Sequence, residues 1–364
     1  MEFTSLSRKN AYTNFYKVSE KTFNKKNSKG NYIYYDFFQC FTYKPIAEGA
    51  EGAVLLANLA KIDEPIIIKI SNLKKLFETK GLNKDILNRN PYDIYNIFNK
   101  LTKDKNLDYL ISCLIETLTY TLVNQLVFQN ICPNFSINYY WEYKQNTLLY
   151  YNEYANYSTL FNWLKTKRSH DEHYNMLIQI TSAIICMQKY YNMIHGDLHS
   201  LNILVHKIKP GGYWKYIINN QEYIVPNLGW IFLVSDYGFT VIPNKINIDW
   251  YYERSIKQLS NKGREFYDFI YLTTHPENIN QIVLNMPQDI QTFIHNIIYK
   301  YNIHTYKNNP NTINENTNMI TILNEFYKLN SIQQIKEAPI EIYNMDKPLN
   351  KNLLPSNFQN LSSF

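Results

Sequence analysis

One stretch of the sequence decides the fold: Ile194-His195-Gly196-Asp197-Leu198-His199-Ser200-Leu201-Asn202-Ile203-Leu204-Val205. It follows residues 171–191, whose apolar spacing predicts a long amphipathic helix, and it ends in a short apolar strand at 203–205. Asp197 and Asn202 therefore lie on the loop that joins a helix to a strand. A carboxylate there can orient and deprotonate a hydroxyl group, and an amide on the same loop can help to hold Mg²⁺.

A second acidic residue follows another predicted strand. Asp236 stands in Ser235-Asp236-Tyr237-Gly238, directly after the apolar run 230–234. A carboxylate at the end of a nearby strand can share one cleft with Asp197 and Asn202. In such a cleft, one acid acts on the hydroxyl group while the amide and the other acid hold Mg²⁺ on phosphate oxygens.

The first part of the chain predicts two extended runs around a glycine-containing turn. The turn is Ala47-Glu48-Gly49-Ala50-Glu51-Gly52-Ala53-Val54, and the second run is the β-branched segment 65–70, which contains Lys69. Taken alone, two such glycines mark a hairpin more often than a phosphate-binding loop. A lysine at the end of a strand is likewise more often a surface residue.

A strong helix is predicted between these two parts of the chain. Leucines recur every four residues from Leu110 to Leu126, and a second stripe at helical spacing includes Glu116 and Tyr120. Both stripes are mainly apolar, so we expect a helix that is covered on two sides. A buried Glu116 would need a cation, which Lys69 would supply; taken alone, Glu116 would be a helix residue in solvent.

Together these motifs resemble the protein-kinase-like superfamily. The family's catalytic loop, H-x-D-x-x-x-x-N followed by D-F-G, matches His195 to Asn202 and Asp236-Tyr237-Gly238, and its glycine loop matches residues 47–54 with Ala47 at the first glycine. The resemblance covers roughly residues 41–330 and is most similar to serine/threonine protein kinases of large DNA viruses. It implies an α+β fold with two lobes: a small antiparallel β lobe with helix αC, and a larger, mainly α lobe.

The resemblance implies a role for each matched residue. Asp197 would orient the attacking hydroxyl group, Asn202 and Asp236 would carry Mg²⁺, and Lys69 would hold the phosphates of ATP while it pairs with Glu116. The other ATP-binding residues that the resemblance implies belong to the glycine loop and to the hinge after the strand 148–151: Ala47, Glu48, Gly49, Ala50, Glu51, Gly52, Ala53, Val54, Glu153 and Ala155.

Three departures from the family pattern leave other functions open. His199 replaces the lysine that serine/threonine kinases usually carry, and H-G-D-L-H also occurs in small-molecule phosphotransferases. The interval between Asn202 and Asp236 is longer than usual, which fits a hairpin around Asn219-Asn220, and no A-P-E follows. The alternatives are therefore an aminoglycoside or choline kinase-like enzyme and a nucleotide-binding pseudokinase scaffold.

Two further residues match structural positions of the family. Asp268, in Phe266-Tyr267-Asp268-Phe269, matches the aspartate that braces the catalytic loop, and the ring of His195 is expected to bond to the backbone. His195 and His199 also stand four residues apart, which allows a zinc pair. We expect no zinc there, because the segment is a loop and offers no cysteine partner.

Composition bounds the remaining possibilities. The 364 residues are 45% apolar and 19% charged, which excludes a wholly disordered chain and a coiled coil. A net charge of +6 without a long basic run does not favour a specific nucleic-acid partner. Four separated cysteines and the shortness of apolar runs such as 65–70 predict a reducing environment and no membrane span. We expect a protein substrate and an intracellular location, in the host cytoplasm or packaged in a virion.

The same patterns divide the chain into four parts. Residues 1–40 are polar and weakly periodic, which indicates an N-terminal extension, and 41–156 would form the β lobe. The α lobe would span 157–344. The Asn- and Ser-rich stretch 345–364 is predicted to be a loose tail.

Regulation can also be predicted from one position. Many protein kinases carry an arginine before the catalytic aspartate, where it binds a phosphate on the activation segment. Gly196 stands there in this chain, and the segment after Gly238 offers Thr240 and Lys245 but no arginine before Arg254. We therefore expect an enzyme that is active without phosphorylation of that segment.

Overall fold

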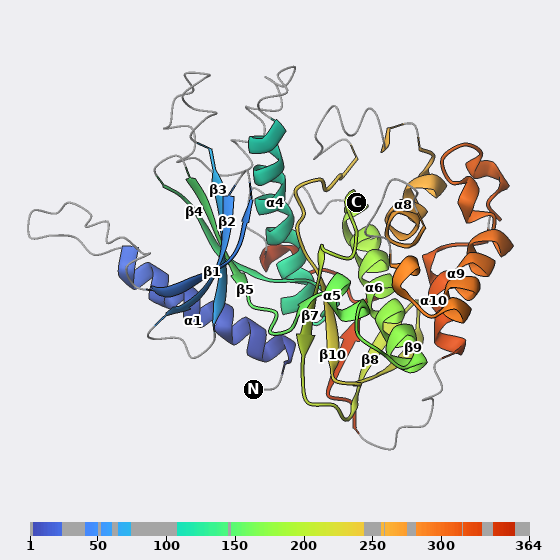
Figure 1. Ribbon diagram of the computed structural model, residues 1–364, viewed down its shortest axis with the longest axis horizontal. Coiled ribbons are helices and arrows are strands. Elements are labelled where there is room, and N and C mark those ends of the chain that lie inside the picture. Colours follow the sequence, from blue (N-terminus) through green and yellow to red (C-terminus); the bar gives the residue numbers. More distant parts are fainter. Residues whose placement is uncertain are drawn as a thin grey trace, which may run out of the picture.

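A computed structural model shows a mixed α+β protein with antiparallel sheets. It describes residues 3–23, 41–49, 52–59, 65–73, 108–144, 147–243, 256–257, 259–274, 282–314, 316–329 and 338–353. Figure 1 shows a sheet half, with a long helix standing beside a twisted sheet, and a helical half next to it. The loop residues Ala50 and Glu51, residues 74–107 and the tail residues 354–364 lie outside the described residues.

The sheet half contains a five-stranded antiparallel sheet in the order β1-β2-β3-β5-β4. Its strands are β1 (Phe41–Gly49), β2 (Gly52–Leu59), β3 (Ile66–Asn72), β4 (Asn138–Lys144) and β5 (Thr147–Glu153). The glycine-containing turn joins β1 to β2, as the sequence predicts. Gly52 faces Ser71 across the β2–β3 ladder, and a Cβ atom on Gly52 would lie 1.7 Å from the carbonyl oxygen of Ile70. Only glycine fits this close approach of two strands.

The predicted leucine-rich helix is confirmed as α4 (Asp108–Phe128). Its five leucines, Leu110, Leu114, Leu118, Leu122 and Leu126, are buried, and so are Glu116 and Tyr120 on the second stripe. Within the part of the chain that the structure describes, this is the one helix with the length and hydropathy of a membrane span, and 83% of its most apolar window is buried inside the protein. A helix covered on both sides by protein is a core helix, which matches its two apolar stripes.

The helical half surrounds a second long helix. Its helices are α5 (Leu160–Leu164), α6 (His170–Tyr191), α8 (Asn261–Thr273), α9 (Gln288–Lys300) and α10 (Met319–Lys328). Short 3₁₀ turns occur at η5 (Val283–Asn285), η6 (Ile303–Thr305), η7 (Pro310–Thr312) and η8 (Lys351–Leu353). Ser158 and Thr159 form the short strand β6, although a serine before a helix often caps it, and α5 begins without a side-chain cap. The cap with both reciprocal bonds belongs to Ser169 and Glu172 at the start of α6.

Two small sheets complete the helical half. In the first, β7 (Ile203–Lys207) pairs antiparallel with β10 (Trp230–Val234) and with β6 (Ser158–Thr159). In the second, the predicted hairpin is present as β8 (Tyr213–Ile218) and β9 (Gln221–Pro226), and β11 (Glu341–Asn344) runs parallel to β8. The sequence analysis did not predict β11, because four residues that pair more than a hundred positions away leave no local pattern.

The chain is ordered beyond the start of the predicted loose tail. Met345 is buried, and the carboxylate of Asp346 accepts hydrogen bonds from the backbone N–H groups of Asn219 and Asn220 at 2.8 and 2.7 Å. Both asparagines have positive φ, as a tight hairpin turn requires. Residues 345–353 are therefore part of the folded structure, and Asp346 holds the β8–β9 turn in place.

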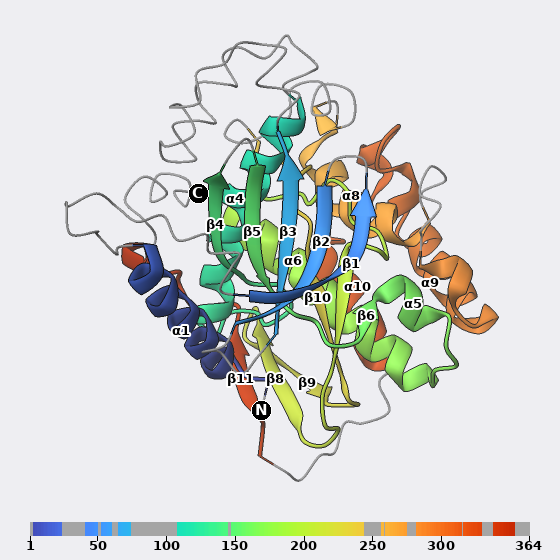
Figure 2. The ribbon, with the colours of Figure 1, turned by 60° about the vertical axis from the view of Figure 1, so that its left-hand side comes forward.

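The N-terminal extension contains a helix that packs on the sheet half. This helix, α1 (Ser5–Phe23), lies along the β4 edge of the sheet, with its N-terminal end beside β8 and β11 (Figure 2). Phe15 is 1% exposed and lies 5.6 and 5.5 Å from the rings of Tyr139 and Tyr151. Among the helix residues whose burial is described, the core-facing side mixes the polar Ser5 and Arg8 with Ala11, Tyr12 and Phe15. Such a mixed side gives no clear apolar stripe, which explains why the periodicity of the sequence did not reveal the helix.

Candidate active site

The β7–β10 ladder brings Asn202 and Asp236 close together. Ile203 faces Val234 in the register, so the residues just outside the ladder also face each other. The backbone N–H and the hydroxyl group of Ser235 both donate to the carbonyl oxygen of Asn202, at 2.9 and 3.0 Å. The long interval between the two residues is taken up by the β8–β9 hairpin, which leaves the ladder and returns to it.

Asp197 is held by side chains from two directions. The amide of Asn202 donates to the backbone carbonyl of Asp197 at 2.9 Å and to its carboxylate at 3.4 Å. The hydroxyl group of Tyr271, on α8, donates to the other carboxylate oxygen at 3.3 Å, and His199 Nε2 lies 3.5 Å from Oδ2. Sequence reasoning missed Tyr271, which no motif in the neighbouring sequence marks.

The loop before Asp197 is held in place by α8. Asp268 is fully buried and accepts the backbone N–H groups of His195 and Gly196, at 2.8 and 3.0 Å. Burial raises the pKa of the Asp268 carboxyl, although His195 and these two N–H groups act in the opposite direction. Asp268 therefore occupies the bracing position that the resemblance implies for it.

His195 is a structural residue in this loop. Its Nε2 atom lies 2.9 Å from the carbonyl oxygen of Ser235, so Nε2 carries the proton, and Nδ1 accepts the backbone N–H of Asp197 at 3.3 Å. The ring thus connects the loop before Asp197 to the strand end before Asp236.

Two backbone conformations at the site are unusual. Gly196 has a φ of 85° and Asp236 has a φ of 63°. The left-handed region is open to glycine but costs free energy for a side chain such as Asp236, and residues held there occur mainly at functional sites. Gly238 is also tightly placed, because a Cβ atom there would lie 2.4 Å from the hydroxyl oxygen of Ser112 on α4.

Three charged residues from separate elements form an ion cluster. Lys69 Nζ on β3 lies 2.9 Å from both carboxylate oxygens of Glu116 on α4 and 3.1 Å from Asp236 Oδ1. The side chain of Glu116 is 4% exposed, that of Lys69 is 29% exposed and that of Asp236 is 50% exposed. The expected ion pair between Lys69 and Glu116 is therefore present, and its open side faces Asp236.

The cluster holds one cation against two carboxylates. Burial opposes the charge of Lys69, but Glu116 and Asp236 outweigh it and raise the pKa of the ammonium well above its usual value. Burial raises the pKa of Glu116 to about 7, against the opposing effect of Lys69 and with a further rise from Asp236. The pKa of Asp236 is lowered, because Lys69 outweighs the effect of its burial. Of the two acids, the more deeply buried Glu116 therefore takes up a proton more readily, and Asp236 stays charged.

This electrostatic arrangement and the donor set fit Mg²⁺. The amide nitrogen of Asn202 is engaged with Asp197, which leaves its Oδ1 atom to act as a ligand, and Asp236 offers an exposed carboxylate. Oxygen ligands and surplus negative charge are what Mg²⁺ requires. Among the residues that the structure describes, no group of three or more His, Cys, Asp and Glu residues lies in a metal-binding arrangement, so the zinc alternative at His195 and His199 has no third ligand.

The predicted glycine loop is placed in part. Ala47, Glu48 and Gly49 end β1, and Gly52, Ala53 and Val54 begin β2, with Gly49 facing Gly52 and Val54 facing Lys69 in the registers. The described ends of β1 and β2 therefore lie at the same end of the sheet as the register position of Lys69.

The predicted hinge residues lie at the end of β5 and just beyond it. The carboxylate of Glu153 does not face a nucleotide site, because it is 6% exposed and bonded at 2.7 Å to Arg8 of α1. Of Glu153, only the main chain remains for contact with a nucleotide. Ala155 is half-buried against the core. Arg8 was missed by the sequence analysis, as was the whole of α1.

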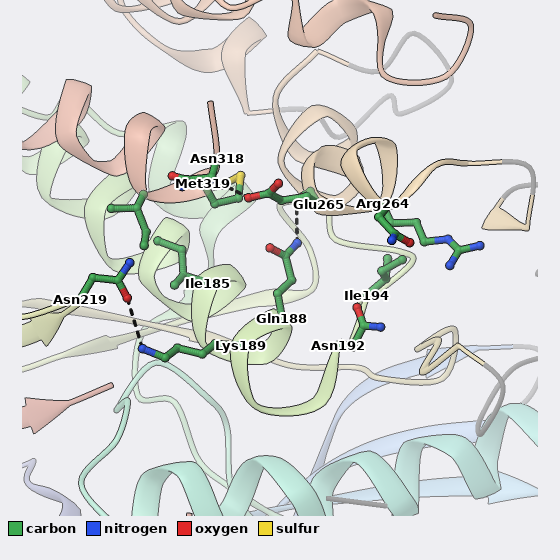
Figure 3. A pocket seen from close by; sticks show the side chains of 12 residues that line it. Ile185, Gln188, Lys189, Asn192, Ile194, Asn219, Arg264, Glu265, Asn318 and Met319 are labelled. Carbon is green, nitrogen blue, oxygen red and sulfur yellow. Dashed lines mark hydrogen bonds between the residues drawn. The ribbon is translucent and has the colours of Figure 1, made fainter. Parts of the chain in front are cut away.

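One sizeable pocket lies apart from these residues. It has a volume of about 510 Å³ and opens between α6, α8 and α10 (Figure 3). Its polar lining is largely engaged internally: Gln188 donates to the backbone carbonyl of Glu265 at 2.6 Å, and Lys189 reaches Asn219 at 3.4 Å. None of the site residues predicted from the sequence lines it.

Comparison with known proteins gives partial similarities to viral proteins. A segment of 72 residues, 19% of this chain, is 36% identical to "Putative serine/threonine-protein kinase 019R" of Frog virus 3 (isolate Goorha) and covers 8% of it. A segment of 108 residues, 29% of the chain, is 31% identical to "Probable serine/threonine-protein kinase 380R" of Invertebrate iridescent virus 6 and covers 20% of it. A third match is 26% identical over 188 residues to "Uncharacterized protein 011L" of Invertebrate iridescent virus 3 and covers 24% of it.

These matches are short relative to the proteins concerned. They span 8 to 24% of the relatives' lengths and 19 to 43% of this chain. No family model matches the chain. The chain is thus partly and distantly similar to viral proteins, two of which carry the names of serine/threonine kinases.

Proposed function

We propose that this chain is an ATP-dependent serine/threonine protein kinase with a two-lobed kinase fold. The observation that carries the proposal is the cluster of Lys69, Glu116 and Asp236, in which residues from β3, α4 and the end of β10 meet within 3.1 Å. Chance turns and surface charges do not bring three separate motifs into one ion cluster in this order. The names of two distant viral relatives support the same reading.

In this proposal, the chain's own side chains divide the work of phosphoryl transfer. Lys69 binds the phosphates of ATP and is held in place by Glu116. Asp197 orients the substrate hydroxyl group and accepts its proton, while Asn202 and Tyr271 fix the carboxylate of Asp197. Asp268 keeps the loop in position through the backbone of residues 195 and 196. Mg²⁺, held by Asn202 and Asp236 when bound, would neutralise the charge that develops on the phosphate oxygens.

A small-molecule phosphotransferase is the second candidate. It is favoured by His199, which stands where a lysine is usual and lies 3.5 Å from Asp197. The third candidate, a nucleotide-binding scaffold without activity, is disfavoured because Lys69, Asp197, Asn202 and Asp236 are all present. Because the relatives are viral proteins, we place the activity inside a host cell or a virion.

One assay separates the three candidates. The purified chain is incubated with radiolabelled ATP and Mg²⁺ beside basic proteins, acidic proteins and aminoglycosides. Label in serine or threonine of a protein supports the kinase, and label in the aminoglycoside supports the second candidate. ATP binding without any transfer would overturn both enzyme assignments.

A further inference from the structure

Arg8, on the N-terminal helix, forms a closed bidentate ion pair with Glu153. Its Nε and Nη2 atoms donate to the two carboxylate oxygens, each at 2.7 Å. Nη1 donates to the backbone carbonyl oxygen of Pro133 at 2.7 Å, and Nη2 also donates to that of Phe135. Arg8 is 3% exposed, and the backbone N–H of Ile137 adds a third donor to Glu153 at 3.3 Å. The fork of an arginine suits this planar recognition, which a lysine cannot reproduce.

The contacts of α1 extend to both sides of Glu153. Phe15 packs on the rings of Tyr139 and Tyr151 in the sheet half. At the other end, Phe3 lies 4.2 Å from the ring of His206 on β7, and the backbone N–H of Ser5 donates to Glu341 on β11 at 2.9 Å. One helix thus connects the sheet half to two strands of the helical half (Figure 2).

The segment that follows Glu153 is fixed at its far end as well. Asn156 and Lys207 exchange two hydrogen bonds: the Asn156 amide donates to the Lys207 carbonyl at 3.0 Å, and the Lys207 N–H donates to Asn156 Oδ1 at 2.7 Å. The backbone N–H of Asn156 also donates to His206 Nδ1 at 3.3 Å. Residues 153–156 are therefore held by Arg8 at one end and by β7 at the other.

We propose that α1 is a splint for this segment and that Arg8 is a positioning residue for nucleotide binding. The inference rests on the proposed function, together with the hinge at Glu153 and Ala155 that the family resemblance implies, where the main chain would contact the base of ATP. Binding is tighter when such a segment is already in its bound conformation, because less ordering remains to be done. A pocket of about 670 Å³, lined by Phe3, Arg8, Glu153 and His206 among others, adjoins the junction and gives the segment room to shift once Arg8 is lost.

Three variants test the splint. Arg8→Gln removes the fork and leaves Glu153 without its cation, and Arg8→Lys keeps the charge without the fork. Phe15→Ala is the matched control, because it weakens the packing of the same helix by a buried large-to-small change at a residue that takes no part in the Arg8–Glu153 ion pair. The readouts are the dissociation constant of a fluorescent ATP analogue with Mg²⁺, the melting temperature, and amide hydrogen exchange at residues 153–156.

We expect Arg8→Gln to weaken binding of the analogue by at least about tenfold, or about 1.4 kcal/mol, and Arg8→Lys to weaken it by less. Exchange at 153–156 should be faster in both. Phe15→Ala should melt lower but bind the analogue within about twofold of the parent. A folded Arg8→Gln protein that binds like the parent would overturn the inference, because the ion pair would then be structural alone.

The remaining outcomes are also decisive. If Arg8→Gln does not fold, Arg8→Lys carries the comparison, and parent-like binding and exchange in it would contradict the splint. If the parent itself binds no analogue, the proposed function fails. In that case hydrogen exchange still decides whether Arg8 fixes 153–156, since equal exchange in Arg8→Lys and Phe15→Ala would exclude it.

Discussion

Two of the ion pairs that a glutamate forms with a basic side chain differ in almost every physical respect. Lys69–Glu116 joins β3 to α4, its ammonium is 29% exposed, and it shares that ammonium with Asp236. Arg8–Glu153 joins α1 to the end of β5, and both of its side chains are nearly inaccessible, at 3 and 6%. The first pair is open on one side, and the second is closed by backbone carbonyl and N–H groups.

This difference indicates which of the two basic side chains can exchange one anionic partner for another. A lysine ammonium is a compact charge on a flexible stem, and a phosphate can replace one of its carboxylate partners without unfolding the site. An arginine fork with four of its five N–H donors engaged has no such freedom. The open pair, Lys69–Glu116, is therefore suited to a site where ligands bind and leave repeatedly. The closed pair, Arg8–Glu153, is suited to holding a fixed geometry.

The largest effect should come from Asp197→Asn, which tests whether the open pair belongs to a reaction centre. The amide can still bond to Asn202 and Tyr271 but cannot accept a proton, so turnover should fall at least about a hundredfold. Binding of the ATP analogue and the melting temperature should stay close to those of the parent. Steady-state phosphorylation of whichever substrate the labelling assay identifies gives the measurement, and undiminished turnover would remove Asp197 from the mechanism.

The second prediction compares the two pairs through the same substitution. Arg8→Met should cost about 3–5 kcal/mol of unfolding free energy, because it leaves a buried carboxylate without compensation. Lys69→Met should cost less, about 1–2 kcal/mol, since Glu116, with a pKa of about 7, can take up a proton when its partner is lost.

Urea unfolding at pH 7 measures the unfolding free energy that each variant has lost relative to the parent. Equal losses would show that the openness of the Lys69 pair has no energetic consequence. A double variant with Glu153→Met beside Arg8→Met is the control, and it should recover part of the loss because no uncompensated charge remains.

The third prediction is a pH dependence of the open pair. Burial raises the pKa of Glu116 from 4.5 to about 7, so the folded state binds this proton more tightly than the unfolded state does. The contribution of Glu116 to stability is therefore greatest below pH 4.5 and is lost as the pH rises towards 7. Lys69 opposes this rise in pKa, so its removal should raise the pKa further.

Lys69→Met should accordingly change in stability relative to the parent as the pH rises above about 7, by up to about 1.4 kcal/mol for each unit of additional shift. Chemical unfolding at a series of pH values measures the difference. Adding Glu116→Gln should abolish its pH dependence, and a difference that stays constant over this range would contradict the assigned coupling.

The open pair could be predicted from the sequence, and the closed pair could not. Lys69 follows a β-branched run and Glu116 begins a stripe on a helix with strong periodicity, so local patterns placed both, together with the loop that carries Asp197 and Asn202. Arg8 stands in a polar helix with no apolar stripe, and its partner is 145 residues away. Nothing in the neighbourhood of either residue indicates such a distant contact.

The same reason accounts for the other omissions. Tyr271 reaches Asp197 from a different helix, and β11 joins β8 from near the end of the chain. The strand before Glu153 has a local pattern, so the sequence predicts Glu153 as a hinge residue, whereas the direction of its side chain depends on a helix that has no such pattern. Sequence patterns thus predicted elements and loop positions, and tertiary pairing decided which way the side chains point.

The smallest effect concerns phosphorylation after Gly238, where the structure gives the prediction a physical basis. Thr240 is fully buried, its backbone N–H donates to the carbonyl of Tyr237 at 3.0 Å, and its neighbour Val241 pairs with Ile194 through two backbone hydrogen bonds. The hydroxyl group of Thr240 has no hydrogen-bond partner within the part of the chain that the structure describes. A phosphate with a charge of about −1.5 to −2 would have to break this packing, and Gly196 offers no cation to receive it.

Protein made in bacteria and treated with phosphatase should therefore be as active as untreated protein. Thr240→Ala should lower activity by less than about tenfold, since it removes one hydroxyl group that makes no bond, and Thr240→Val, which keeps the volume, should lower it even less. The charges around Lys69 are all supplied by the chain itself, so the open pair needs no added phosphate to be complete. A drop of about tenfold or more after phosphatase treatment and in both variants, or about 1.4 kcal/mol of lost transition-state stabilisation, would mean that Gly196 has been misread and that a phosphate orders this segment.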